Sequence, residues 1–151
     1  MKKILCFCLV CLIFSGFAIF SSAASDKLSN EKQYYKIVVD DNDSVQLQQI
    51  SESEYLMATM TRSAHYAEGW VVTSVTGTTV AYLTLHYQTT VSAGKKVFDL
   101  STAYFEANPQ NGYAGHLDYL SSSVHSINVK YTYANLLGDN GYRTHRFYPQ
   151  Q

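Results

Sequence analysis

Alternation between apolar and other side chains is the feature of this sequence that most restricts its fold. In residues 77–91, GTTVAYLTLHYQTTV, every second residue from Ala81 to Tyr87 is apolar. Side chains in an extended chain point alternately to its two sides, so this period of two predicts a strand with one buried face. The opposite face of the same strand carries Tyr82, Thr84 and His86.

The same kind of pattern continues through most of the chain. Short runs rich in Val, Thr, Tyr and Ile are separated by Gly, Asn, Asp and Ser, which is typical of strands joined by turns. The sequence therefore predicts an all-β fold, namely a single antiparallel β-sandwich, immunoglobulin-like or similar, of seven to nine strands within residues 34–151. The candidate strands are 34–39, 44–50, 54–61, 70–76, 79–91, 96–105, 113–120, 124–136 and 142–148.

One of these candidates fits a helix as well as a strand. Ser51 precedes Glu54 by three residues, which is the spacing of a capping box at a helix N-terminus. The residues that follow, YLMATM, are apolar on both sides of an extended chain. A short helix over 52–60 is therefore an alternative to a strand there.

Turn residues predict how the strands are joined. Gly77 and Thr78 fit a two-residue type II′ loop, which would pair Val72 with Leu83 and place His86 opposite Gly69. In that register one face holds the expected core residues Trp70, Val72, Ala81, Leu83 and Leu85.

Two Asn-Gly dipeptides predict further hairpins, because both residues accept positive φ angles. Asn111-Gly112 would join 96–105 to 113–120, and Asn140-Gly141 would join 124–136 to 142–148.

The N-terminal segment has the layout of a secretory signal peptide. Two lysines are followed by an apolar run from Ile4 to Phe20 and by small residues suited to cleavage near Ala24. We expect a signal peptide over 1–24, a flexible lead-in over 25–33, and a secreted or cell-surface protein without a membrane span after cleavage. An uncleaved membrane anchor is the alternative. All three cysteines lie in this leader, so the mature chain offers no thiolate ligand or cysteine nucleophile.

The charge balance argues against nucleic acid as a partner. The chain has 11 basic and 12 acidic residues, and two of its lysines belong to the leader. No stretch concentrates basic residues as a phosphate-binding surface requires. No cofactor or metal is expected.

The uncharged face with Tyr82, Thr84 and His86 favours a binding role. A sheet face open to water would normally carry Lys and Glu, and the chain has 13 tyrosines, whose rings and hydroxyls suit wet recognition surfaces. The leading hypothesis is a non-catalytic module that binds a glycan, a cell-wall polymer or a protein.

Two other functions follow from other features. His116 and Asp118 would share one face of a strand, so a small hydrolase using this pair with a third group is one alternative. A self-associating structural protein of the cell surface or matrix, in which the uncharged face meets another sheet, is the other. Arg143 and His145 also share a face and could hold an anion with help from a carboxylate.

Overall fold

The computed structural model describes residues 28–42, 44–60 and 66–150, so the expected signal peptide lies outside the described residues. Gln33, placed in the expected lead-in, is already the first residue of a strand, and Ser29 forms a β-bridge with Gly115. β1 therefore begins one residue before the predicted boundary at residue 34.

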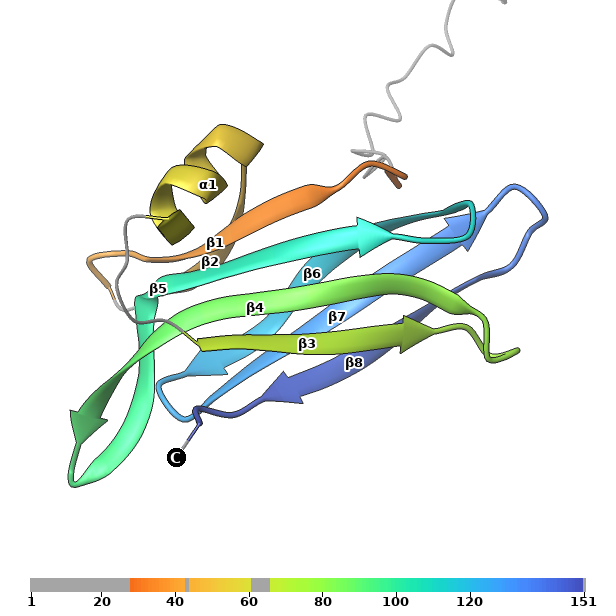
Figure 1. The fold of residues 1–151 in the computed structure, drawn as a ribbon. Coiled ribbons are helices and arrows are strands. Elements are labelled where there is room, and N and C mark those ends of the chain that lie inside the picture. The colour runs from red at the N-terminus through yellow and green to blue at the C-terminus, as the bar shows by residue number, and fades with distance from the viewer. Residues whose placement is uncertain (1–27, 43, 61–65, 151) are drawn as a thin grey trace, which may run out of the picture.

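Eight strands and one helix make up the described chain (Figure 1). The elements are β1 Gln33–Val39, β2 Val45–Ile50, α1 Glu52–Met60, β3 Tyr66–Thr73, β4 Thr79–Ser92, β5 Lys95–Pro109, β6 Tyr113–Ser123, β7 Ser126–Asn135 and β8 Asn140–Phe147.

These strands form two antiparallel sheets that pack face to face. One sheet has five strands in the order β2-β1-β5-β4-β3, and the other has three in the order β6-β7-β8. The all-β sandwich predicted from the alternation is confirmed, with a strand number inside the expected range.

The core lies between the inner faces of the two sheets, as the period of two requires. Leu83 and Leu85 on β4 are buried, and Phe105 on β5 meets Phe147 on β8 with ring centroids 5.8 Å apart. Burial of a side chain such as Leu83 stabilises the fold by about 1.5–3 kcal/mol.

The segment that fitted either a helix or a strand is the helix α1. The Ser51 hydroxyl accepts a hydrogen bond from the Glu54 amide at 3.2 Å, as the capping-box spacing predicts. Glu52 and Glu54 in the first turn also favour the helix through its dipole. Tyr55 is its buried residue, and it anchors the helix on the outer face of the five-stranded sheet.

The predicted register between β3 and β4 is wrong by two residues. Val72 pairs with Ala81 rather than Leu83, and His86 lies opposite Ala67 rather than Gly69. The reason is a longer turn, residues 74–78, in which Gly77 has a φ of +86°. A shift of two residues leaves every side chain on its face, so the predicted apolar face remains the core face.

Asn111 and Gly112 do not form the predicted hairpin. β5 and β6 belong to different sheets, and this turn, with φ angles of +53° and +74°, carries the chain from one sheet to the other. A sandwich needs such a crossing, and local turn chemistry does not distinguish it from a hairpin.

The second predicted hairpin, between β7 and β8, is present, but its turn lies elsewhere. Gly138 has the positive φ of +88°, whereas Asn140 and Gly141 are paired within β8. The turn therefore begins at Asn135 and ends at Asp139.

Two glycines of the three-stranded sheet make room for tyrosine rings. A Cβ atom on Gly115 would lie 2.0 Å from the Tyr131 hydroxyl, and one on Gly141 would lie 3.0 Å from the Tyr133 hydroxyl. Both tyrosines are buried in the core. Tyrosine rings thus fill the space that these glycines leave, as is known for glycines paired with aromatic residues across strands.

Candidate functional site

The five residues predicted to bind a ligand lie on two different sheets. Tyr82, Thr84 and His86 are on the outer face of β4, whereas His116 and Asp118 are on the outer face of β6. They therefore belong to two separate surfaces rather than one.

Helix α1 covers part of the surface around His86. The ring of Tyr55 lies edge-on to the His86 ring at 5.8 Å and contacts the Tyr34 ring at 4.7 Å. Lys36 of β1 forms an ion pair with Glu54 of the helix at 2.7 Å. Tyr82 remains 47% exposed, so the predicted face is open at Tyr82 and partly covered at His86.

Tyr34 shows how closely the helix packs on this sheet. Its hydroxyl donates a hydrogen bond to Glu52 at 2.8 Å. Burial, together with this hydrogen bond, raises the pKa of Tyr34 to about 12. The Tyr34 hydroxyl is therefore partly buried where α1 meets the sheet.

A cleft of about 370 Å³ lies between the edge strands β2 and β6. Its lining combines apolar side chains with side chains that form hydrogen bonds. They are Tyr35, Val45, Gln46, Leu47, Gln49, His116, Leu117 and Asp118.

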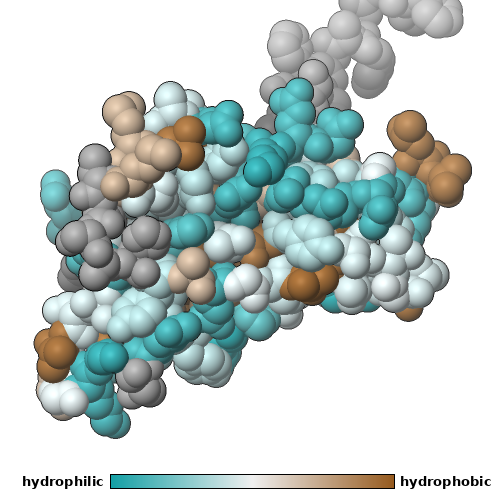
Figure 2. Space-filling view, in the orientation of Figure 1, coloured by the Kyte–Doolittle hydropathy of each residue, from teal (hydrophilic) through white to brown (hydrophobic). Residues whose placement is uncertain are grey.

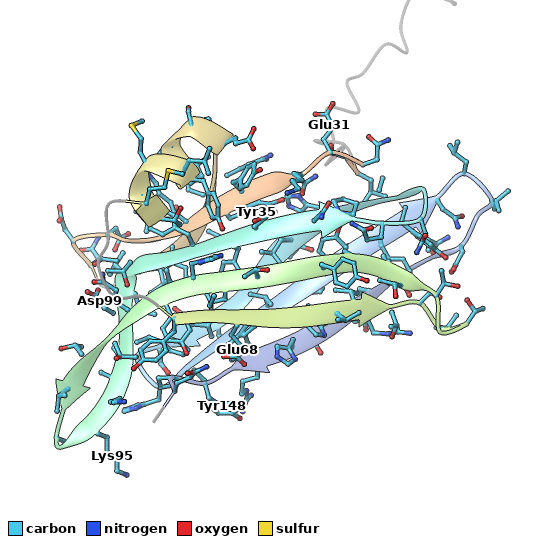
Figure 3. The ribbon with its side chains drawn as sticks, viewed as in Figure 1. Glu31, Tyr35, Glu68, Lys95, Asp99 and Tyr148 are labelled. Carbon is cyan, nitrogen blue, oxygen red and sulfur yellow. The ribbon has the colours of Figure 1, made fainter. Side chains whose placement is uncertain are left out.

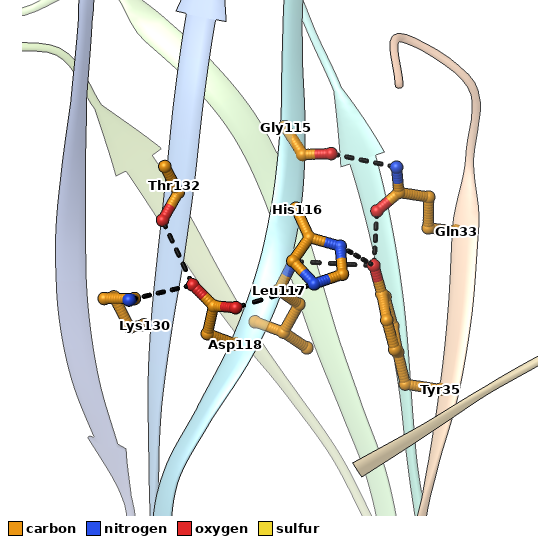
Figure 4. A network of polar contacts seen from close by, with 8 residues as sticks. All are labelled: Gln33, Tyr35, Gly115, His116, Leu117, Asp118, Lys130 and Thr132. Carbon is orange, nitrogen blue, oxygen red and sulfur yellow. Dashed lines mark hydrogen bonds and ion pairs between the residues drawn. The ribbon is translucent and has the colours of Figure 1, made fainter. Parts of the chain in front are cut away.

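Asp118 is the centre of a network of polar contacts at this cleft (Figure 4). Its carboxylate is 3.5 Å from His116 Nε2 and 2.9 Å from Lys130 Nζ, and it accepts a hydrogen bond from Thr132 at 3.2 Å. Lys130 and Thr132 lie on the neighbouring strand β7, next to Asp118 and His116 in the register. The carboxylate is thus held in place, and the charge of Lys130 balances its own.

Tyr35 reaches the same network from the other sheet. Its hydroxyl lies 3.2 Å from His116 Nδ1, donates to Gln33 Oε1 at 2.5 Å and accepts from the Leu117 amide at 3.4 Å. Gln33 Nε2 donates to the Gly115 carbonyl at 2.8 Å. Side chains of β1 therefore form hydrogen bonds with backbone groups of the edge strand β6, in the place of the neighbouring strand that β6 lacks on this side.

Arg143 and His145 share one face of β8, as predicted, and it is the face turned toward the other sheet. His145 stacks on Trp70 of β3, with ring centroids 5.0 Å apart and planes at 14°. Burial lowers the pKa of His145, because the charged imidazolium loses its water. This pair of rings joins the two sheets at the edge opposite the cleft.

Sequence and structural comparisons found no relatives of this protein. No known family matches this chain. No curated protein and no solved structure is significantly similar to it. Its function must therefore be inferred from its own residues.

In residues 28–42, 44–60 and 66–150, no three His, Cys, Asp or Glu side chains are grouped to hold a metal ion. Over the same residues, no helix combines the length and hydropathy needed to cross a bilayer.

Sequence reasoning missed the residues that complete the cleft. Tyr35 and Gln33 come from the first strand, 82 residues before their partners on β6. No local pattern relates segments so far apart. Lys130 and Thr132 could have been predicted, because pairing β6 with β7 in the correct register places them next to Asp118 and His116.

Proposed function

We propose that this protein is an exported, non-catalytic binding module that holds a glycan segment in the cleft between β2 and β6. The observation that carries the proposal is the mixed lining of this cleft. Val45 and Leu47 offer apolar contact, and Gln46 and Asp118 offer hydrogen-bonding groups, with His116 next to Asp118. Small-molecule sites combine an apolar wall with a few well-placed polar groups in this way, and a sugar ring presents both kinds of surface.

The charges at the cleft favour a neutral ligand. Lys130 lies 2.9 Å from Asp118, so the carboxylate is already balanced by a cation of the protein. An anionic ligand such as a phosphate would meet the carboxylate of Asp118, which has no spare cation next to it in the network. Hydroxyl groups, which both donate and accept, suit the Asp118 and Gln46 side chains better.

The contacts of His116 support binding rather than catalysis. One ring nitrogen faces the Tyr35 hydroxyl and the other faces Asp118, so neither is directed at a ligand. Tyr35 is buried, and its hydroxyl is also bonded to Gln33. A hydrolase that uses His116 and Asp118 is the second candidate, and it would require the ring to leave one of these partners.

Binding to a panel of glycans and cell-wall polymers tests the proposal. We expect His116→Ala and Asp118→Ala to weaken binding about tenfold each, because Asp118→Ala removes an acceptor from the cleft and His116→Ala removes the ring that contacts Asp118. Isothermal titration calorimetry of the natural protein and both variants, with the glycan or polymer that binds in the panel, gives the dissociation constants.

Tyr82→Ala on β4 is the matched control, since Tyr82 is exposed on the other sheet. Equal weakening by Tyr82→Ala and by the two cleft variants would contradict the proposed site. Hydrolysis of any glycan in the panel, lost in His116→Ala, would instead support the second candidate.

A further inference from the structure

Two turns at one end of the sandwich are built alike. Residues 74–78 join β3 to β4, and residues 135–139 join β7 to β8. In each turn the first residue donates its amide to the carbonyl four residues on, and the fourth residue is a glycine with a φ of +86° or +88°.

In both turns, the side chain of the first residue accepts hydrogen bonds from backbone amides of the same turn. Asn135 Oδ1 accepts hydrogen bonds from the amides of Leu137 and Asp139, both at 3.0 Å. Ser74 Oγ does the same for Thr76 and Thr78, at 3.3 and 3.2 Å. Turns that bind their own amides lose little when water is removed from them.

Both turns display apolar side chains at their tips. Leu136 and Leu137 are almost fully exposed, with Leu137 at 95%, and Val75 is 75% exposed. Turn positions favour Pro, Asp, Asn, Ser and Gly, so turn propensity does not explain the presence of two leucines. In the space-filling view, hydrophobic side chains project from the end of the molecule where the β7–β8 turn lies (Figure 2).

The β5–β6 turn contacts both of these turns or the strands beside them. The Tyr113 hydroxyl donates to Asp139 at 2.5 Å, and Asn111 Nδ2 donates to the Thr79 carbonyl at 2.9 Å. The Tyr113 ring packs edge-on against the buried Tyr133 at 5.7 Å. The two turns therefore lie at the same end of the ribbon (Figure 1).

This end carries almost no charge. Among residues 73–79, 108–113 and 134–141, Asp139 is the one charged residue in the sequence, and Tyr113 binds its carboxylate. The remaining polar residues are amides and hydroxyls, which suit an uncharged, hydrogen-bonding surface.

We infer that this end of the sandwich inserts the side chains of Val75, Leu136 and Leu137 into the interface of a lipid bilayer with zwitterionic headgroups. Apolar side chains that enter the boundary between headgroups and acyl chains bind by the apolar area they bury. The lack of cations fits headgroups without net charge. A protein pocket is the competing occupant, but two separate projecting tips would each need a matched hollow, whereas a fluid bilayer adapts to both.

Tryptophan placed at the tip reports insertion directly. In the full chain we expect the emission of Leu136→Trp to be quenched by vesicles of brominated phosphatidylcholine. Val91→Trp is the matched control, because Val91 is 70% exposed beside the β4–β5 hairpin tip. That hairpin, marked by Lys95, lies at the other end of the molecule (Figure 3). We expect the control to lose no more emission than the natural Trp70 alone loses.

Two further measurements test whether the apolar side chains or the lipid charge cause the quenching. Adding Leu137→Ser and Val75→Ser to Leu136→Trp should lower its partitioning about tenfold or more, since two buried apolar side chains are lost. Adding phosphatidylglycerol should leave the quenching unchanged. Quenching of Leu136→Trp no stronger than that of Val91→Trp would overturn the inference and leave a protein pocket as the occupant. Quenching that requires the anionic lipid would overturn it as well.

Discussion

The outer faces of the two sheets are used in different ways, although the same alternation of residues produces both. The five-stranded sheet carries α1, and tyrosines from the helix and the sheet close over His86. The three-stranded sheet carries rows of polar side chains instead, such as Asp118 beside Lys130 and Asn128 beside Arg146. Alternation therefore tells which side chains share a face, and it does not tell what lies over that face.

The glycines of the two sheets also differ in their surroundings. On the inner face of the three-stranded sheet, ring atoms of Tyr131 occupy the space next to Gly115, whereas Gly69, on the outer face of the five-stranded sheet, has only a carbonyl at 3.9 Å from an added Cβ. We expect Gly115→Ala to lower the free energy of unfolding by about 3 kcal/mol or more, because a buried ring must move. Gly69→Ala should change it by less than about 0.5 kcal/mol. Urea denaturation of both variants measures the difference, and equal losses would contradict it.

The helix that covers one face should contribute measurably to stability. Tyr55 is buried against Tyr34 and His86, and Tyr55→Ala is expected to lower the free energy of unfolding by about 2–3 kcal/mol. Met60→Ala, on the same helix and 79% exposed, is the control and should have an effect below about 0.5 kcal/mol. A loss as small for Tyr55→Ala as for Met60→Ala would mean that the helix does not stabilise the sheet.

One ion pair on each outer face allows a direct comparison. Lys36–Glu54 joins β1 to the helix, and Lys130–Asp118 joins two strands of the other sheet. Both are partly exposed to water, so each should contribute about 0.2–1 kcal/mol. Double-mutant cycles with Lys→Met and with Glu→Gln or Asp→Asn give the coupling energies. We expect both to fall when the salt concentration rises, and a coupling insensitive to salt would contradict this view.

The smallest effect is expected where the two sheets meet at Trp70 and His145. Burial lowers the pKa of His145 below its ordinary value of 6.5, so the folded state binds this proton less readily than the unfolded state. The contribution of neutral His145 to the free energy of unfolding is present above pH 6.5 and is lost as the pH falls through the lowered pKa. His145→Phe should reduce the loss of stability between pH 7 and pH 5. His125→Gln, in the exposed turn before β7, is the control, and an equal change in both variants would contradict the assignment.

The sequence was sufficient for the elements and for the faces of the strands. Val72, Ala81 and Leu83 share the core face, because a period of two survives an error of two residues in register. The capping box at Ser51 and Glu54 predicted a helix only as an alternative to a strand, and that alternative is α1. These features depend on neighbours in the chain.

The pairing of segments that are distant in the chain could not be predicted from the sequence. The β5–β6 turn has good hairpin residues, yet it joins two sheets, because the sandwich needs a crossing that no dipeptide specifies. The cleft was half predicted for the same reason. His116 and Asp118 are two residues apart and follow from alternation, whereas Tyr35 approaches them from another sheet.

The contacts between β1 and β6 also set the order in which this domain can fold. Gln33 and Tyr35 meet Gly115 and Leu117 across 82 residues, and β1 lies between β2 and β5 in its sheet. Contacts of such long range form slowly, because a large loop must close first. A chain that leaves a ribosome or a secretion channel N-terminus first would keep its first strand incomplete until most of the domain had followed. The contacts of Gln33 and Tyr35 with β6 would then be among the last to form.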